Sequence, residues 1–460
     1  MVKRIETIII ARLFRHVFVL FLLLAIIGQL PVQMNHGQFG QVSAQVISQN
    51  IHRDEQRPLP HVSAAFGNKI EEVLIFIQPA NPDSALNPGK AIALLSALEA
   101  DRSQLNAYEL VLLYQYFGYA YLAQENYARA ADYFNRALAQ SPHLPVAMEA
   151  QILLVLGQVY LVDDKPRQAL NTMQRWTEYI DDMHPDQWAL FAKIYYKLGD
   201  NDDALVNITE AIDAQLDNKK IPAESWYLLQ HSLYVEKEDY KNGLVSLKKL
   251  VGYYPKARYW KSLSHIYGEL KRDEESLAAL EICYQLGGLT TEKELLNLSY
   301  LLMEENAPYK AAKVLRKGLY VDRIIAPDPN NLMLLAESLR LAKNSKESLV
   351  EYEKAAKNSR DPELILRLAS AYYDNGKFKE ASRTARTALK APRLKRVDHA
   401  NFVVGQAELA QNNFDEALTF FEAASKDLRS EASAKEWITY VEREKMKTST
   451  TSATALPVRQ

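Results

Sequence analysis

The sequence predicts an all-α protein, a right-handed α-solenoid of about nine to ten helix–turn–helix repeats with a C-terminal capping helix. Three observations predict it. The stretch from Tyr114 to Pro142 places aromatic and small residues on facing sides of two successive helices. The same offsets recur along most of the chain. Gly and Pro are sparse among 460 residues, with 16 and 18 copies, which suits a chain that is helical throughout.

Within this stretch the small residues carry the physical argument. Gly118 and Ala130 are expected where the two helices approach most closely, because a longer side chain there would push the helices apart. Tyr121 and Phe134 fill the space around that contact, and Pro142 ends the second helix. An isolated amphipathic hairpin would not explain why the pattern recurs. The pattern resembles the tetratricopeptide repeat, a helical hairpin of about 34 residues.

Residues 1–44 are expected to be a targeting segment that is cleaved as a signal peptide. A basic start precedes an apolar core at 17–27, and Val42, Ser43 and Ala44 offer small residues for cleavage. The alternative is a retained inner-membrane anchor facing the periplasm, but the apolar run is shorter than the roughly 20 residues that span a bilayer. With Cys283 as the only cysteine and a bacterial-looking signal, we expect the periplasm.

The remaining chain divides by composition and periodicity. Residues 45–65 are expected to form a flexible leader, and 66–110 a degenerate first repeat that serves as the N-terminal cap. The repeat array covers 111–428. Its expected units are approximately 111–144, 150–183, 185–218, 224–255, 257–290, 292–325, 329–361, 362–395 and 398–428. Residues 429–447 are expected to form an amphipathic capping helix, and 448–460 a disordered tail.

No group of residues in the sequence indicates catalysis, and we expect no enzymatic activity, metal, cofactor or small-molecule substrate. His-Glu-x-x-His, Cys-x-x-Cys and phosphate-binding glycine loops are all missing from the sequence. His265 has no sequence-apparent partners for metal binding or base catalysis, and Cys283 is expected to be a buried, inert thiol. The net charge of −2 gives no support to nucleic acid as a partner.

A protein or peptide partner is therefore expected on the inner surface of the array. The first helix of each repeat lines that surface, and Tyr and Arg contribute strongly to binding energy. The alternative is that these side chains only contact solvent or one another. The Lys and Asn set with which some tetratricopeptide domains hold a C-terminal carboxylate is not reproduced. The candidate binding residues are Tyr119, Gln158, Lys193, Tyr196, Lys261, His265, Tyr300, Arg340 and Tyr373.

The chain also resembles a narrower group, the periplasmic tetratricopeptide proteins of proteobacteria that are associated with TonB energy-transduction systems. The similarity rests on 105–134, 224–270 and 294–319, among them LNAYELVLLYQYFGYAYLAQENYARAADYF and ELLNLSYLLMEENAPYKAAKVLRKGL. The resemblance implies partners such as TonB or its ExbB- and ExbD-like motor proteins, and it supplies no catalytic residues. The proline-rich insertion at 78–88 departs from the pattern and leaves contacts of the first repeat open.

These observations lead to two hypotheses. The first is a non-enzymatic periplasmic scaffold, an accessory component of a TonB-type system for the uptake of iron or another nutrient. The alternative is a periplasmic chaperone or adaptor in outer-membrane or envelope biogenesis, which would bind unfolded segments through the same surface. Growth under iron limitation distinguishes them.

Overall fold

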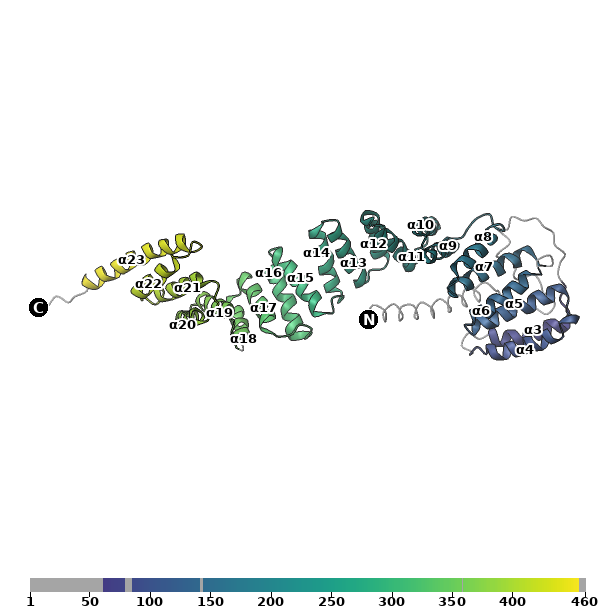
Figure 1. Ribbon diagram of the computed structural model, residues 1–460, viewed down its shortest axis with the longest axis horizontal. Helices are drawn as coiled ribbons and strands as arrows, with labels where there is room; N and C mark the ends of the chain where they lie inside the picture. The colour runs from purple at the N-terminus through teal and green to yellow at the C-terminus, as the bar shows by residue number, and fades with distance from the viewer. Residues whose placement is uncertain (1–60, 79–84, 141–143, 358, 455–460) are drawn as a thin grey trace. The chain divides into compact units, whose positions relative to one another are not determined.

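The computed structural model describes residues 61–78, 85–140, 144–357 and 359–454. These residues form helices and contain no β-strand. The chain divides into two compact units, Met1–Tyr254 and Pro255–Gln460, termed the N-terminal unit and the C-terminal unit. Within each unit every helix packs against the next one along the chain (Figure 1). The predicted all-α solenoid of helical hairpins is confirmed.

The described part of the N-terminal unit is a series of helix pairs. In each pair the helix that comes first along the chain is termed the first helix, and its partner the second helix. The pairs are α3 (Ala64–Ile77) with α4 (Pro88–Ala100), α5 (Ala107–Ala123) with α6 (Tyr127–Leu138), α7 (Val146–Val162) with α8 (Pro166–Thr177), α9 (Pro185–Leu198) with α10 (Asn201–Asp217), and α11 (Glu224–Glu236) with α12 (Tyr240–Tyr253).

The C-terminal unit continues the same arrangement and ends with an unpaired helix, α23 (Glu431–Thr454). A π-helical segment, η3 (Lys317–Val321), extends α16. The pairs are α13 (Ala257–Glu269) with α14 (Asp273–Gln285), α15 (Glu292–Glu304) with α16 (Pro308–Arg316), α17 (Pro329–Leu341) with α18 (Ser345–Ala356), α19 (Pro362–Asp374) with α20 (Phe378–Lys390), and α21 (Val397–Leu409) with α22 (Phe414–Ala424).

A glycine on the first helix lets a large side chain of the second helix reach the backbone. A Cβ atom at Gly118 would lie 2.6 Å from the ring of Phe134, which is fully buried. Because a real Cβ cannot approach so closely, only glycine fits there. Two further pairs have the same geometry at the same repeat positions, Gly157 with Met173 and Gly405 with Phe421.

In two repeats of the C-terminal unit, a serine of the second helix forms a hydrogen bond to the backbone of the first helix. Ser276 Oγ donates to the carbonyl oxygen of Ser264 at 2.8 Å. Ser348 Oγ donates to the carbonyl oxygen of Ala336, also at 2.8 Å. Both serines sit on second helices, and both acceptors sit at the repeat position that Gly118 occupies. Small side chains therefore keep the two helices close by a second means.

The repeat of α11 and α12 has a large residue where the first helix otherwise carries a small one. His231 occupies the repeat position of Gly118, and Gly243 lies opposite it on the second helix. His231 Nδ1 lies 3.2 Å from the carbonyl oxygen of Gly243 and donates to it in the tautomer that carries a proton there. Burial lowers the pKa of His231. A missing side chain on the second helix thus makes room for a large one on the first.

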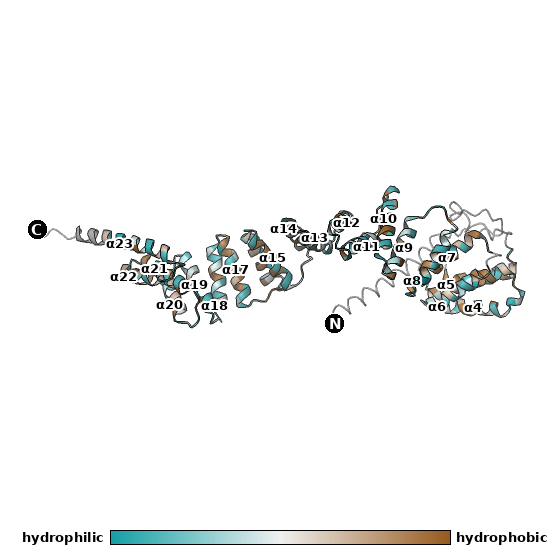
Figure 2. Ribbon diagram, turned by 45° about the horizontal axis from the view of Figure 1, so that its top comes forward, coloured by the Kyte–Doolittle hydropathy of each residue, from teal (hydrophilic) through white to brown (hydrophobic). Residues whose placement is uncertain are grey.

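Aromatic residues fill the space between helices, as their abundance suggests. Phe117 and Tyr133 stack with ring centroids 4.4 Å apart in the α5–α6 pair. At the other end of the chain, Trp437 of α23 stacks on Phe421 at 5.7 Å. Figure 2 shows apolar and polar residues interspersed along the helices, as expected when one side of each helix is buried. Helix α23 therefore covers the apolar side of the last pair.

Several expected boundaries differ from the observed ones. The leader was expected to reach residue 65, but α3 begins at Ala64 because the Ser63 side chain accepts a hydrogen bond from Phe66 N. The array was expected from 111, but an Asn106–Glu109 capping box starts α5 at 107. The tail was expected to be disordered from 448, but α23 ends at 454. No Gly or Pro interrupts the sequence before Pro457, so nothing in it breaks the helix earlier.

The predicted targeting segment at 1–44 and residues 45–60 of the predicted leader lie outside the described residues. The same holds for most of the insertion at 78–88. In the part of the chain that the structure describes, no helix has both the length and the apolar character needed to cross a membrane.

A buried carboxylate fixes the approach to α23. The carboxylate of Asp398 is buried at the start of α21. It accepts hydrogen bonds from Arg396 Nη2 at 2.9 Å, Arg429 Nη2 at 3.3 Å and Ser430 Oγ at 2.7 Å. The hydrogen bond from Arg396, supported by that from Ser430, holds the pKa of Asp398 well below its usual range. Arg429 and Ser430 immediately precede α23, so this cluster ties the capping helix to the preceding pair.

We expect Gly118→Val to lower the free energy of unfolding by about 2–3 kcal/mol, because the added side chain would overlap the fully buried ring of Phe134. Thermal and urea unfolding followed by circular dichroism measure this change. The matched control is Gly252→Ala on α12, where no atom lies within 4 Å of the added Cβ. That control should be neutral or stabilising by up to about 1 kcal/mol. Equal destabilisation by both changes would contradict the close-contact interpretation.

We expect Asp398→Asn to destabilise the capping helix by about 1–3 kcal/mol, because two arginines lose their shared buried carboxylate. The lowered pKa means that the ionised Asp398 stabilises the fold above the unfolded-state pKa of about 4, and that this contribution disappears as the pH falls further. Fluorescence of Trp437 during acid and urea titrations reports the loss.

The control for this change is Asp415→Asn, which removes the exposed ion pair between Asp415 and Lys445 of the same capping helix. An exposed pair contributes little, so this variant should unfold within about 0.5 kcal/mol of the parent. The role assigned to Asp398 would be wrong if the two variants unfolded alike at neutral pH.

Candidate protein-binding surface

All nine predicted binding residues lie on first helices, as their repeat positions require. They are distributed as Tyr119 on α5, Gln158 on α7, Lys193 and Tyr196 on α9, Lys261 and His265 on α13, Tyr300 on α15, Arg340 on α17, and Tyr373 on α19. Whether these side chains bind a partner remains a prediction.

In the N-terminal unit, the first predicted residues are half-buried. The hydroxyl of Tyr119 accepts a hydrogen bond from Gln115 Nε2 at 3.1 Å, and its ring meets Phe134 edge to face at 5.4 Å. Burial raises the pKa of Tyr119 and lowers the pKa of Lys193. Gln158 is also half-buried. These side chains are held in place and leave only part of their surface for a partner.

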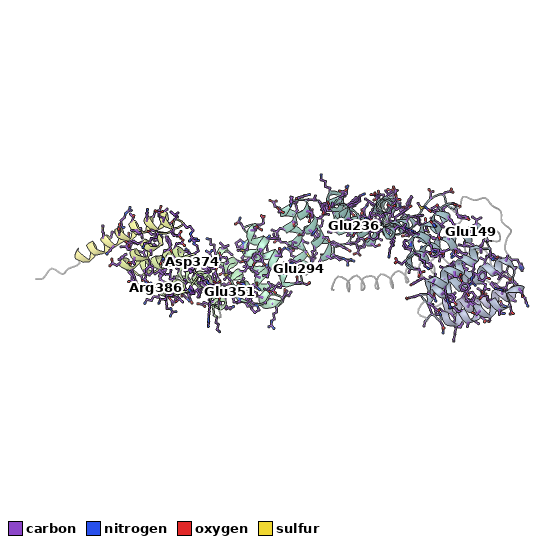
Figure 3. All side chains as sticks on the ribbon, viewed as in Figure 1. Glu149, Glu236, Glu294, Glu351, Asp374 and Arg386 are labelled. Atoms are coloured by element: carbon purple, nitrogen blue, oxygen red, sulfur yellow. The ribbon has the colours of Figure 1, made fainter. Side chains whose placement is uncertain are left out.

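Tyr196 is exposed and connects two successive first helices. Its hydroxyl donates to Glu236 Oε1 of α11 at 3.4 Å, while Asn201 Nδ2 donates to Glu236 Oε2 at 2.9 Å. Glu236 is labelled in Figure 3. The shared carboxylate therefore holds the end of α9 beside the end of α11.

In the C-terminal unit, Lys261 is already paired. Its Nζ donates to Oε1 of Glu294 on α15 (labelled in Figure 3), and that carboxylate also accepts from the backbone N–H groups of Thr290 and Thr291 at 2.9 and 3.1 Å. Burial alone would raise the pKa of Glu294, but these hydrogen bonds outweigh burial and lower it to about 2. Lys261 thus holds α13 to the start of α15 and offers a partner less than the sequence suggested.

His265 and Tyr300 are the most accessible of the predicted residues in this unit. The His265 side chain is exposed, with Nε2 3.8 Å from Glu269 Oε1 one turn along α13. Tyr300 is 56% exposed although it is large and aromatic. An exposed Tyr at a repeat position shared with Tyr119 is a natural contact for another chain, because Tyr buries a large area with few rotatable bonds.

Arg340 belongs to a charged cluster that the sequence did not reveal. Its guanidinium reaches Glu337 one turn earlier, with Nη2 2.6 Å from Oε1. Glu337 Oε2 lies 3.5 Å from Arg367 Nη1 of α19 and accepts from the Tyr352 hydroxyl. Burial opposes ionisation of Glu337, but the hydrogen bonds from Arg340 and Tyr352 outweigh it and lower its pKa. This inner arginine cluster comprises Glu337, Arg340, Tyr352 and Arg367.

Tyr373 on α19 lies one turn after Ser370, which forms a polar contact with α21. Its ring is 5.5 Å from that of Phe378. Ser370 Oγ lies 3.4 Å from Nε2 of His399 on α21. Burial lowers the pKa of His399, and nearby arginines act in the same direction, whereas burial raises the pKa of Asp374 (labelled in Figure 3). The neutral forms of both groups are thereby favoured.

Side-chain contacts join the first helices of the C-terminal unit to one another, and one of them, at Ser338, is buried. Each contact links one first helix to the next, so the contacts run from α13 to α21. The linking contacts are Lys261 with Glu294, Ser338 with Met303, Glu337 with Arg367, and Ser370 with His399.

Sequence reasoning missed Glu337 and Ser370, although a signal for both was present. They occupy the same position within their repeats as Tyr119, Gln158, Lys193, His265 and Tyr300. Applying that offset to every repeat would have found them. Arg367 and His399 lie at other offsets, and their roles depend on contacts between helices that a sequence does not show.

The described residues contain no group of three or more His, Cys, Asp and Glu side chains that could hold a metal ion. Cys283 is fully buried, and burial raises the pKa of its thiol. The arrangement offers hydrogen-bond donors, guanidinium groups and aromatic rings along helices, which are the means of binding another polypeptide.

Two family models of the tetratricopeptide repeat match the chain, at residues 121–194 and 366–431. No curated protein matches it. Among solved structures, it is similar to MamA, with 14% identity and a TM-score of 0.34 over 39% of this chain and 92% of that one. It is also similar to YrrB, described as a TPR protein with an unusual peptide-binding site, with 14% identity and a TM-score of 0.33 over 42% and 90%.

A third similar structure is the P58(IPK) TPR domain, with 13% identity and a TM-score of 0.24 over 84% of this chain and 99% of that one. These similarities carry no weight for function. Solenoids of this kind serve as protein-interaction scaffolds through their extended surfaces.

We expect the Cys283 thiol to react with an alkylating reagent at pH 8 at least about 100-fold more slowly in the folded chain than in urea, since it is buried and un-ionised. Mass spectrometry of timed samples measures the rate. Reaction at similar rates in both conditions would show an accessible thiol and would reopen the question of chemistry at this position.

Residues 121–194 and 366–431 thus match the tetratricopeptide repeat, and the helical pairs with their close contacts form hairpins of the same kind in both units.

Proposed function

We propose that the chain is a non-enzymatic periplasmic scaffold that binds a polypeptide segment on its first helices, as an accessory component of a TonB-type energy-transduction system. The observation that carries the binding role is the exposure of His265 and Tyr300 on α13 and α15, two successive first helices of the C-terminal unit. The periplasmic location rests on the apolar core and cleavage pattern within 1–44. The link to TonB rests on the sequence resemblance over 105–134, 224–270 and 294–319.

Tyr300 is the best position at which to test this role. It is exposed on a first helix, next to the buried Ser299, whose hydroxyl bonds within the helix to Leu295 O at 2.8 Å. A change at Tyr300 therefore leaves the packing of α15 intact. The same repeat supplies a matched control in Tyr309, which is 72% exposed on the second helix α16. The two residues differ in the helix that carries them and not in chemical type.

We expect a benzophenone amino acid that replaces Tyr300 to cross-link a partner protein in cells on irradiation, and the same group at Tyr309 to cross-link it at least about ten-fold less, since binding occurs on first helices. Mass spectrometry of the cross-linked band identifies the partner. The proposal predicts TonB or one of its motor proteins.

Equal cross-linking from both positions would contradict binding on the first helices. Capture of unfolded outer-membrane segments at Tyr300 would favour the chaperone alternative and exclude the TonB role. Growth of a deletion strain separates the two further. A defect confined to iron limitation supports transport, whereas general envelope sensitivity supports biogenesis.

A further inference from the structure

Helix α20 exposes a row of basic side chains that form no ion pair with any described residue. Lys379, Arg383 and Lys390 are all exposed. At 100° per residue, they fall within about 40° of one another around the helix axis. The opposite side of α20 is closely packed on α19 and α21. The buried residues of α20 are Ala381, Ser382, Ala385 and Ala388. The basic row is therefore fixed in its direction by a rigidly seated helix.

Helix α10 exposes a row of the opposite charge. Asp203, Glu210, Asp213 and Asp217 are exposed and form no ion pair with any described residue. They fall within about 80° of one another around the axis of α10. Val206 lies among them and is 58% exposed. The buried side of α10 packs on α9 and α11, so this row too is held in one direction.

We propose that the basic row of α20 on one copy of the chain binds the acidic row of α10 on a second copy. The two rows are similar in length. Asp203 to Asp217 span about 21 Å along α10, and Lys379 to Lys390 span about 17 Å along α20. Each row consists of residues of one sign. A second copy supplies a row of opposite charge to each of them.

The composition around each row extends the complementarity. Asp and Glu outnumber Lys and Arg within 178–239, which surrounds α10, whereas Lys and Arg outnumber Asp and Glu within 308–395, which ends after α20. The net charge of the whole chain is nonetheless only −2. Charge is thus separated along the chain, and unlike segments of two copies attract one another.

Physical chemistry sets the character of this contact. Like charges along one helix repel, and an opposing row from another copy removes that repulsion. Exposed ion pairs contribute little individually and are screened by salt, so the association is expected to be weak and dependent on ionic strength. The exposed Val206 adds apolar area at the centre of the acidic row.

Sedimentation velocity of the full chain tests the proposal. We expect the sedimentation coefficient to rise with protein concentration at about 50 mM NaCl, and the apparent dissociation constant to increase at least about ten-fold at 500 mM NaCl. Association through the apolar segment at 17–27 would instead be insensitive to salt. Pairing of the two rows within a single copy would leave the chain monomeric at every concentration. Either result would overturn the proposal.

Charge reversal identifies the surfaces. Arg383→Glu with Lys390→Glu, or Glu210→Lys with Asp213→Lys, should each weaken self-association at least about ten-fold. An equimolar mixture of the two double variants should associate again, because the reversed rows are complementary to one another. The control Lys241→Glu with Lys249→Glu, on exposed sites of α12, should associate like the parent.

Circular dichroism checks that each variant folds. If a reversal prevents folding, Arg383→Gln with Lys390→Gln removes the charges more gently and should still weaken association. Failure of the mixed variants to associate, with both folded, would contradict a contact between the two rows. The proposal does not depend on the periplasmic scaffold role, so either can fail alone.

Discussion

The close approach of the two helices in each pair is the constraint on which the structure depends. At Gly118, Gly157 and Gly405 the first helix has no side chain, and a large buried residue of the second helix occupies that space. In other pairs a serine of the second helix forms a hydrogen bond to a first-helix carbonyl, and His231 lies against the carbonyl oxygen of Gly243. Several different combinations of residues thus allow the two helices of a pair to pack closely.

This constraint explains how chemistry is distributed over the chain. One side of each helix is committed to packing, so polar groups collect on the remaining surface. On the first helices they pair between successive repeats, as Lys261 does with Glu294 and Arg367 with Glu337. On second helices such as α10 and α20 they form exposed rows. Asp398 anchors the capping helix α23. Without α23, the last helix pair would expose its apolar side to water.

Much of the fold could be predicted from the sequence because the small and aromatic positions recur at a nearly constant interval. The expected helix pairs are all present. Where an observed helix boundary differs from the expected one, local capping residues mostly explain the difference. The capping box of Asn106 and Glu109 lengthens α5, and α23 continues to 454 because nothing breaks it. The π-helical segment after α16 was not expected. Gly318 in this segment packs against Ile325, and a sequence pattern does not show such a contact.

The candidate site was less predictable for a physical reason. A repeat position tells which helix and side a residue occupies, but not which neighbour it bonds. Lys261 meets Glu294 across 33 residues, and Arg340 meets Glu337 across three. These pairings decide which side chains remain available, and they depend on the stacking of repeats. Tyr300 is exposed, as its repeat position suggested.

Native-state hydrogen exchange tests the central claim most directly, because it reports the stability of each helix pair separately. If the close contacts hold each pair together, the amides of α5 around Gly118 and of α7 around Gly157 will be among the slowest to exchange. They will open together with the amides around Phe134 and Met173 on their partner helices. Exchange there as fast as in the turns, or opening of first and second helices independently of one another, would contradict the account.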